Sequence, residues 1–133
     1  MRRLIIFVLV FFSANVAHAA VETITGVGVH YVSDDETLAY AKEQAELSAE
    51  VSALEQAAVF VKSYTAVNNF RLSDDEIIAI AAGILYVKDV SHEIGEEFDG
   101  MLVVKATVTA EIDTDEVAEL LEREIQRRRQ PHD

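Results

Sequence analysis

The sequence contains no cysteine and no tryptophan, and its single proline is Pro131, close to the C-terminus. Without cysteine the chain has no disulfide, no thiol nucleophile and no residue to carry the acyl chains of a lipoprotein. Small domains of the eukaryotic secretory route usually contain disulfides, so an exported chain without cysteine favours a bacterial periplasm. The absence of internal proline and of low-complexity linkers indicates one continuous domain.

Recognisable catalytic motifs are also missing. There is no G-x-S-x-G and no H-E-x-x-H, and Gly26-x-Gly28 lacks the third glycine of a dinucleotide loop. His30 and His92 are isolated on predicted strands, so we expect each to face solvent or to be hydrogen-bonded rather than to bind a metal. The sequence therefore predicts a protein that is not an enzyme and has no cofactor.

Positive charge is scarce. The net charge at pH 7 is −13, and loss of an N-terminal leader that contains Arg2 and Arg3 would make the remainder more acidic. Such a surface repels phosphate backbones and anionic lipids, so we predict that the chain does not bind nucleic acid.

Residues 1–19 have the organisation of a secretory signal peptide. Arg2 and Arg3 precede an apolar run, and Ala17-His18-Ala19 follows it as an A-x-A cleavage site. The alternative is a retained membrane anchor, but Leu4–Val16 is shorter than the roughly 20 apolar residues of a spanning helix. We therefore predict cleavage after Ala19, a periplasmic or secreted location, and no stable membrane anchor afterwards.

A strand with two glycines and a helix with regularly spaced alanines begin the predicted domain. Residues 21–32 alternate in polarity and place Gly26 and Gly28 on one face, where close approach of another element is expected. A capping box of Ser33 and Glu36 predicts a helix that runs to about residue 63. This helix carries a stripe of small side chains at every fourth position, which we expect to pack on the glycine face: Ala41, Ala45, Ala49, Ala53 and Ala57.

An extended connector, residues 64–72, separates this helix from a shorter one. Ser73 and Glu76 form a second capping box, which predicts a helix over residues 74–82. Gly83 stands where a C-terminal cap glycine is expected.

Two strands and a last helix complete the prediction. Residues 84–94 and 101–112 are separated by the polar loop 95–100, which predicts a β-hairpin with alternate residues of its second strand buried. Asp113 and Glu116 begin a helix that ends in three arginines, whose charge suits the negative end of the helix dipole.

The order β-α-α-β-β-α predicts an α+β fold, a small antiparallel sheet with the long alanine-striped helix packed on one face. We expect a signal peptide over residues 1–19, a single α+β domain over 20–126 and a basic C-terminal tail over 127–133.

Acidic clusters provide the only candidates for a metal site. Those at residues 34–36, 74–76 and 113–116 lie at predicted helix starts, where capping and the helix dipole account for them. The hairpin loop carries three acids without such an explanation, and these are weak candidates for calcium: Glu96, Glu97 and Asp99. A ligand- or calcium-binding module that uses this loop is the alternative function.

Two segments are candidates for binding a partner protein. The connector contains Asn68, Asn69 and Phe70, which either pin a loop to the core or form a partner-binding edge. The apolar stripe of the last helix contains Leu120, Leu121 and Ile125, which would be contacts if that helix is not fully docked. The open edge of the sheet is a third surface for binding.

Several of these segments occur together in one known family. They are the T-G-V-G-V strand, the alanine-spaced helix over residues 39–58, the connector 63–70, the D-E-I helix into Ala82-Gly83, and the hairpin end V-V-K-A-T-V-T-A-E-I. Over residues 21–112 the chain resembles the family typified by the N-terminal domain of flagellar assembly protein T and by small outer-membrane lipoproteins of the Helicobacter type.

The resemblance implies a non-enzymatic module of the cell envelope, and some members of the family take part in assembling outer parts of the flagellar motor. This chain lacks the lipoprotein cysteine. We therefore expect an exported domain that acts through protein–protein contacts in the assembly of an envelope or flagellar structure. Its partner would be a protein of the cell envelope or, in a homo-oligomer, a second copy of the chain.

Overall fold

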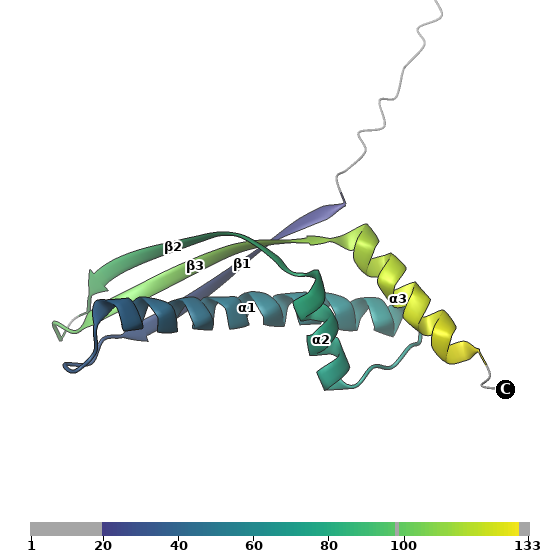
Figure 1. The fold of residues 1–133 in the computed structure, drawn as a ribbon, viewed down its shortest axis with the longest axis horizontal. Helices are drawn as coiled ribbons and strands as arrows, with labels where there is room; N and C mark the ends of the chain where they lie inside the picture. The colour runs from purple at the N-terminus through teal and green to yellow at the C-terminus, as the bar shows by residue number, and fades with distance from the viewer. Residues whose placement is uncertain (1–19, 98, 131–133) are drawn as a thin grey trace, which may run out of the picture.

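The computed structural model describes residues 20–97 and 99–130 and has two layers, a three-stranded sheet and a set of helices on one of its faces (Figure 1). The α+β class and the order β-α-α-β-β-α are confirmed. The elements are β1 (Val21–Tyr31), α1 (Leu38–Val67), α2 (Asp74–Ile84), β2 (Tyr86–Glu96), β3 (Leu102–Asp113) and α3 (Thr114–Arg129).

The sheet has the strand order β1-β3-β2, and β3 pairs with both neighbours in antiparallel orientation. The hairpin strand β3 is therefore central, while β1 and β2 are the edges. Alternate residues of β3 face the helices and are buried, as the sequence pattern predicts: Val104, Ala106, Val108, Ala110 and Ile112.

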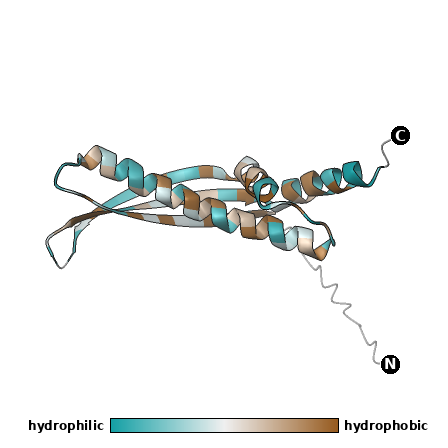
Figure 2. Ribbon diagram, turned by 90° about the horizontal axis from the view of Figure 1, so that it is seen from below, coloured by the Kyte–Doolittle hydropathy of each residue, from teal (hydrophilic) through white to brown (hydrophobic). Residues whose placement is uncertain are grey.

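The long helix α1 lies along this face of the sheet, as Figure 2 shows from the helix side. Its alanine stripe is fully buried, and the same four-residue spacing continues beyond the predicted stripe to Val61 and Thr65. Gly26 and Gly28 are buried opposite the stripe. The predicted packing of the alanine stripe on the glycine face is confirmed.

Both ends of α1 differ from the prediction. The helix begins at Leu38 with Thr37 as its N-cap, whose hydroxyl accepts a hydrogen bond from Tyr40 N at 3.2 Å. Ser33 and Glu36 instead close a separate turn, in which the Glu36 carboxylate accepts from the Ser33 N–H at 3.2 Å. A serine and a glutamate three residues apart can satisfy free N–H groups in a turn as well as at a helix start. The predicted start of α1 at Ser33 is therefore too early.

At its C-terminal end α1 continues to Val67, so the first residues of the predicted extended connector are helical. Asn69 has a φ of 52°, in the left-handed region, and its N–H donates to the Ala66 carbonyl at 3.2 Å. The Phe70 N–H donates to the Thr65 carbonyl at 2.9 Å. This pair of bonds is a Schellman motif with asparagine in the position that glycine usually takes.

The other two helices have the predicted starts. Ser73 and Glu76 form the complete capping box of α2, and the Asp113 carboxylate accepts from the N–H groups of Asp115 and Glu116 at 3.0 and 3.1 Å. Gly83 is not a cap, because α2 continues through Ile84 and its C-cap is Leu85.

The hairpin strands begin and end one or two residues later than predicted, with β2 over Tyr86–Glu96 and β3 over Leu102–Asp113. An irregularity between Val87 and Asp89 interrupts the pairing of β2 with β3, which marks a β-bulge at Lys88. Within residues 20–97 and 99–130, no helix is long and apolar enough to cross a membrane.

Candidate functional site: a groove beside an open strand

The edge strand β2 is left largely uncovered by the helices. Only Val90 is half-buried, and every other residue of the strand is exposed. The contacts of α1 with the sheet are mainly with β1 and β3. A depression therefore lies between α1 and β2 on the helix side of the sheet.

This depression is a groove of about 340 Å³ with a mainly apolar lining. We call it the α1–β2 groove. Its lining combines one side of α1, the end of α2 and the start of β2: Leu47, Glu50, Val51, Leu54, Ala82, Leu85 and Val87.

The apolar side chains around the groove are unusually accessible. Leu47, Val51 and Val87 are 49%, 54% and 47% exposed, and Ile94, farther along β2, is 48% exposed. Single exposed apolar residues are ordinary on protein surfaces, but a contiguous group on two adjacent elements is typical of an interaction surface.

The backbone edges of β1 and β2 differ in protection. At the β1 edge, the Gln56 side chain from α1 donates to the Thr25 carbonyl at 2.8 Å and so occupies an outward backbone acceptor. For β2, β3 is the only pairing strand among the described residues. An unprotected edge strand presents a row of N–H and C=O groups that an extended segment can pair with.

Acidic side chains border the groove. Glu50 lines it directly, and Glu46 lies 3.3 Å from the His92 imidazole, which connects α1 to β2 at one end. Lys88 is the only cation of β2, and its ammonium group lies 3.5 Å from the Glu111 carboxylate. The groove therefore has an apolar floor and a negative rim.

The fold brings the connector and α3 together at the opposite end of α1. The Arg128 guanidinium lies 5.5 Å from the centre of the Phe70 ring and forms an ion pair with Glu76. The Arg128 hydrogen bond and the Ser73 N–H lower the pKa of Glu76 below its ordinary value. Conversely, its bonds to Glu76 and to Glu124 raise the pKa of Arg128. Phe70 and Arg128 thus serve to fasten α3 to the start of α2.

The predicted partner contacts of this region are occupied within the fold. Leu121 and Ile125 are 0% and 5% exposed and belong to the core, so they are unavailable to a partner while α3 stays docked. Leu120 is half-buried against the core and lines a cleft between α2 and α3. Asn68 and Asn69 are exposed, but their amides complete the end of α1.

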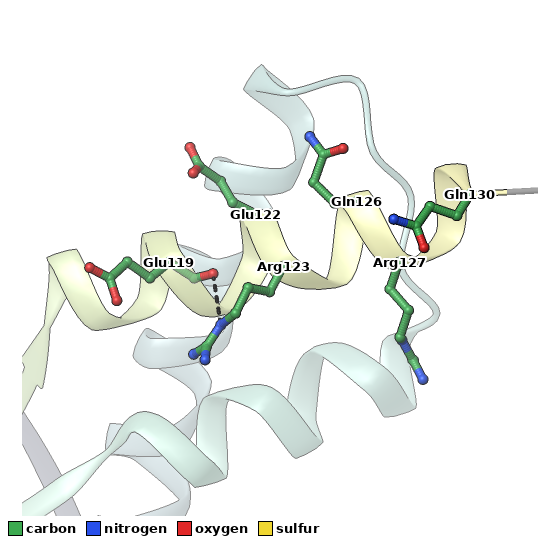
Figure 3. A pocket seen from close by; sticks show the side chains of 6 residues that line it. All are labelled: Glu119, Glu122, Arg123, Gln126, Arg127 and Gln130. Carbon is green, nitrogen blue, oxygen red and sulfur yellow. Dashed lines mark hydrogen bonds between the residues drawn. The ribbon is translucent and has the colours of Figure 1, made fainter.

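A hollow on the outer side of α3 is unlike a binding site. Figure 3 shows the six side chains that line it, all from one helix and its last turn. They project along a convex surface, and the one hydrogen bond drawn joins Arg123 Nε to the Glu119 carbonyl at 3.4 Å. Side chains from a single convex helix do not converge on a ligand.

Two of the three predicted calcium candidates accept hydrogen bonds from different donors. The Glu97 carboxylate accepts from the Tyr31 hydroxyl at 3.4 Å, the Asp99 carboxylate accepts from the Met101 N–H at 3.1 Å, and Glu96 is exposed at the end of β2. Among the described residues no group of three or more histidine and acidic side chains is placed to hold a metal ion. Calcium binding by this loop stays a prediction.

The two histidines on the strands have carboxylate neighbours, as expected for hydrogen-bonded residues. His30 Nε2 lies 2.8 Å from the Glu36 carboxylate, and its ring meets Tyr40 edge-on with centroids 6.3 Å apart. The His30 hydrogen bond, together with the Ser33 N–H, lowers the pKa of Glu36. This arrangement ties the turn before α1 to the sheet.

The α1–β2 groove was not among the sites predicted from individual residues, although an open sheet edge was. A signal for it exists in the sequence: Leu47, Val51 and Leu54 follow the spacing of a second apolar stripe on α1, beside the alanines. What the sequence does not show is that β2, rather than β1, lies next to that stripe.

Comparison of the chain with protein families, with curated proteins and with solved structures finds no significant match. The fold and the groove are therefore the observations from which function is argued.

Proposed function

We propose that this protein is an exported, non-enzymatic domain of the cell envelope that acts through protein–protein contacts, and that the α1–β2 groove with the free edge of β2 is its binding surface. The observation that carries the proposal is the coincidence of two features at one place, an unprotected strand edge and a contiguous apolar groove. Either feature alone is common, whereas together they match the requirements for adding a partner segment to a sheet.

The remainder of the described surface supports a binding role more than a catalytic one. The acids with lowered pKa values, Glu36, Glu76 and Glu124, each accept from a histidine or arginine that fixes a turn or a helix. An active site usually leaves perturbed groups in a cleft free to meet a substrate. Glu36, Glu76 and Glu124 do line hollows of the surface, but their carboxylates are engaged by His30, Arg127 and Arg128. Here these groups act in holding the fold together.

The proposed place of action is supported by the leader and by the family resemblance. The signal-like segment predicts release into the periplasm or beyond, and the resemblance to the flagellar assembly protein T family favours a role in building an envelope or flagellar structure. Mass spectrometry of the purified protein tests export directly. We expect an N-terminus at Ala20, and an intact Met1 would contradict cleavage.

Partner capture with matched variants tests the binding surface. Leu47→Asp and Val51→Asp place charge in the groove, while Val59→Asp makes the same change on α1 at a residue that is 64% exposed and outside the groove. We expect proteins retained from envelope extract by the unaltered protein and by Val59→Asp to be lost with both groove variants. Identical retention by all four proteins would refute the proposed surface.

A further inference from the structure

We infer that the segment received by the α1–β2 groove is an extended, basic strand of a different protein, which pairs through its backbone with β2. This inference rests on the proposed function and adds the conformation and charge of the partner segment. Its three supports are the backbone of β2, the apolar floor of the groove and the distribution of charge around it.

The backbone of β2 selects an extended partner. The strand is 11 residues long and has a partner on one side only within the described part of the chain. Its outward N–H and C=O groups are spaced for a ladder of hydrogen bonds, which a helix cannot supply because its own backbone groups are already paired. The bulge at Lys88 divides the ladder, so the longer regular stretch runs from Asp89 to Glu96.

The groove selects the side chains on one face of that strand. A strand added beside β2 continues the sheet, and alternate side chains point toward the helix layer. Those side chains would lie against Leu47, Val51 and Val87, which are half-exposed and apolar. The partner strand is therefore expected to be apolar at every second position.

The surrounding charge selects basic residues at the remaining positions. Asp89 and Glu93 lie on the face of β2 that points away from the helices, as do their partners Thr109 and Lys105 on β3. Of the two lysines near that face, Lys88 is paired with Glu111, and Lys105 stands opposite Glu93 on β3, on the side away from the free edge. Lysine or arginine side chains on that face of an added strand would lie beside Asp89 and Glu93, and the net charge of −13 attracts a basic segment, which raises the association rate and the specificity.

The same charge argues against a second copy of this chain as the occupant. The net charge of −13 means that two copies repel each other at neutral pH. Antiparallel pairing of β2 with itself would also place the acidic residues of one copy close to those of the other. A basic partner removes this repulsion, whereas a homodimer doubles it.

A titration with synthetic strands tests the inference. The probe is a twelve-residue peptide in which valine alternates with lysine, added to isotope-labelled protein purified from cells that express the full chain. Amide chemical shifts report where it binds. We expect changes along β2 and around Leu47 and Val51, with β1 unaffected. A peptide with glutamate in place of lysine should bind at least about tenfold more weakly, and added salt should weaken the lysine peptide.

Two further probes separate the parts of the inference. A lysine peptide with alternate backbone nitrogens methylated cannot complete the hydrogen-bond ladder, and we expect its affinity to fall at least tenfold, an estimate that corresponds to losing a few net hydrogen bonds. Leu47→Asp should abolish the response of β2 to the unmodified peptide, while Val59→Asp should leave it unchanged.

Other outcomes overturn the inference without touching the proposed function. Equal affinity for lysine and glutamate peptides would remove the charge argument, and equal affinity for the methylated peptide would remove strand pairing. Absence of any β2 response at millimolar peptide would refute a basic strand, although envelope proteins could still be captured through Leu47 and Val51. Concentration-dependent dimerisation in sedimentation, abolished by Leu47→Asp, would identify a second copy as the occupant.

Discussion

A side chain at Gly28 would place its β-carbon 2.1 Å from the carbonyl oxygen of Ala45, far inside van der Waals contact. Gly26 stands in the same relation to the Ala49 carbonyl. The backbone of α1 therefore lies directly on β1, with only hydrogen atoms between them at these two points. Because this contact fixes α1 over β1 and β3, the long helix cannot also cover β2, and the α1–β2 groove follows from it.

Gly28→Ala is expected to destabilise the fold. The added methyl meets backbone atoms, which cannot rotate away, so helix and strand must separate; we expect a loss of at least about 1–3 kcal/mol in the free energy of unfolding. The control is Gly83→Ala, because a β-carbon at Gly83 has open space and lies in a helix. That change should stabilise by about 0.5–1 kcal/mol. If Gly28→Ala and Gly83→Ala changed the free energy of unfolding in urea equally, the close contact between β1 and α1 would be contradicted.

Ala45→Leu tests the helix side of the same contact. Ala45 is fully buried, so three additional carbons overpack the interface, and we expect a loss of roughly 1–3 kcal/mol. Ala39→Leu makes the same change at an exposed position of α1 and should alter stability by less than about 0.5 kcal/mol. A melting temperature unchanged by Ala45→Leu would show that the alanine stripe is not closely packed.

The ion pair between Arg128 and Glu76 should make stability depend on pH. The folded pKa of Glu76 is lowered from 4.5, so its contribution is present above that value and is lost as the pH falls through the folded pKa. Arg128→Gln removes the largest cause, so the Glu76 pKa, followed by carboxyl carbon NMR, should rise toward 4.5. Arg123→Gln, whose parent guanidinium donates to the Glu119 carbonyl instead, should leave it unchanged. A Glu76 pKa that rises in Arg123→Gln but not in Arg128→Gln would refute the ion pair between Arg128 and Glu76.

Leu121→Asp and Leu47→Asp should differ greatly in their effect on the stability of the fold. Leu121 is fully buried, so Leu121→Asp leaves an unpaired charge in the core and should unfold much of the population. Leu47 is half-exposed, and Leu47→Asp should change the free energy of unfolding by less than about 1 kcal/mol. Circular dichroism during thermal melting distinguishes them. A stable, folded Leu121→Asp protein would mean that α3 is not docked and would return Leu121 to the partner contacts.

Calcium provides a test of the acidic hairpin loop. Because the carboxylates of Glu97 and Asp99 already accept hydrogen bonds from separate donors, we expect millimolar calcium to leave the melting temperature unchanged. A ligand that binds only the folded state raises that temperature by mass action. A concentration-dependent rise, absent in Glu97→Gln and Asp99→Asn, would establish a calcium site in the loop and refute this expectation.

Much of the fold could be predicted from local patterns. The alternation of β3, the alanine spacing of α1 and the Ser73–Glu76 box each carry their structural meaning within a few residues, and each is confirmed. The helix ends were less predictable. Ser33 and Glu36 satisfy a turn instead of a helix start, and Asn69 takes the left-handed position at the end of α1 that glycine usually occupies.

The groove depends on information that is not local. Its position follows from the strand order β1-β3-β2, which places β2 away from the glycine contact that holds α1. A single sequence shows that Leu47 and Val51 are apolar, but not that they stand beside an uncovered strand. For the same reason, burial of Leu121 and Ile125 could only be established once α3 was placed against the core.

Site-specific photocrosslinking in living cells tests most directly whether the α1–β2 groove is the interaction surface. A photoreactive residue replaces Val51 or Val87 in the groove, or Val59 on the same helix outside it. The account predicts discrete adducts with a larger protein from Val51 and Val87 and none from Val59. Adducts from Val59 alone, or no adduct from either groove position, would contradict it.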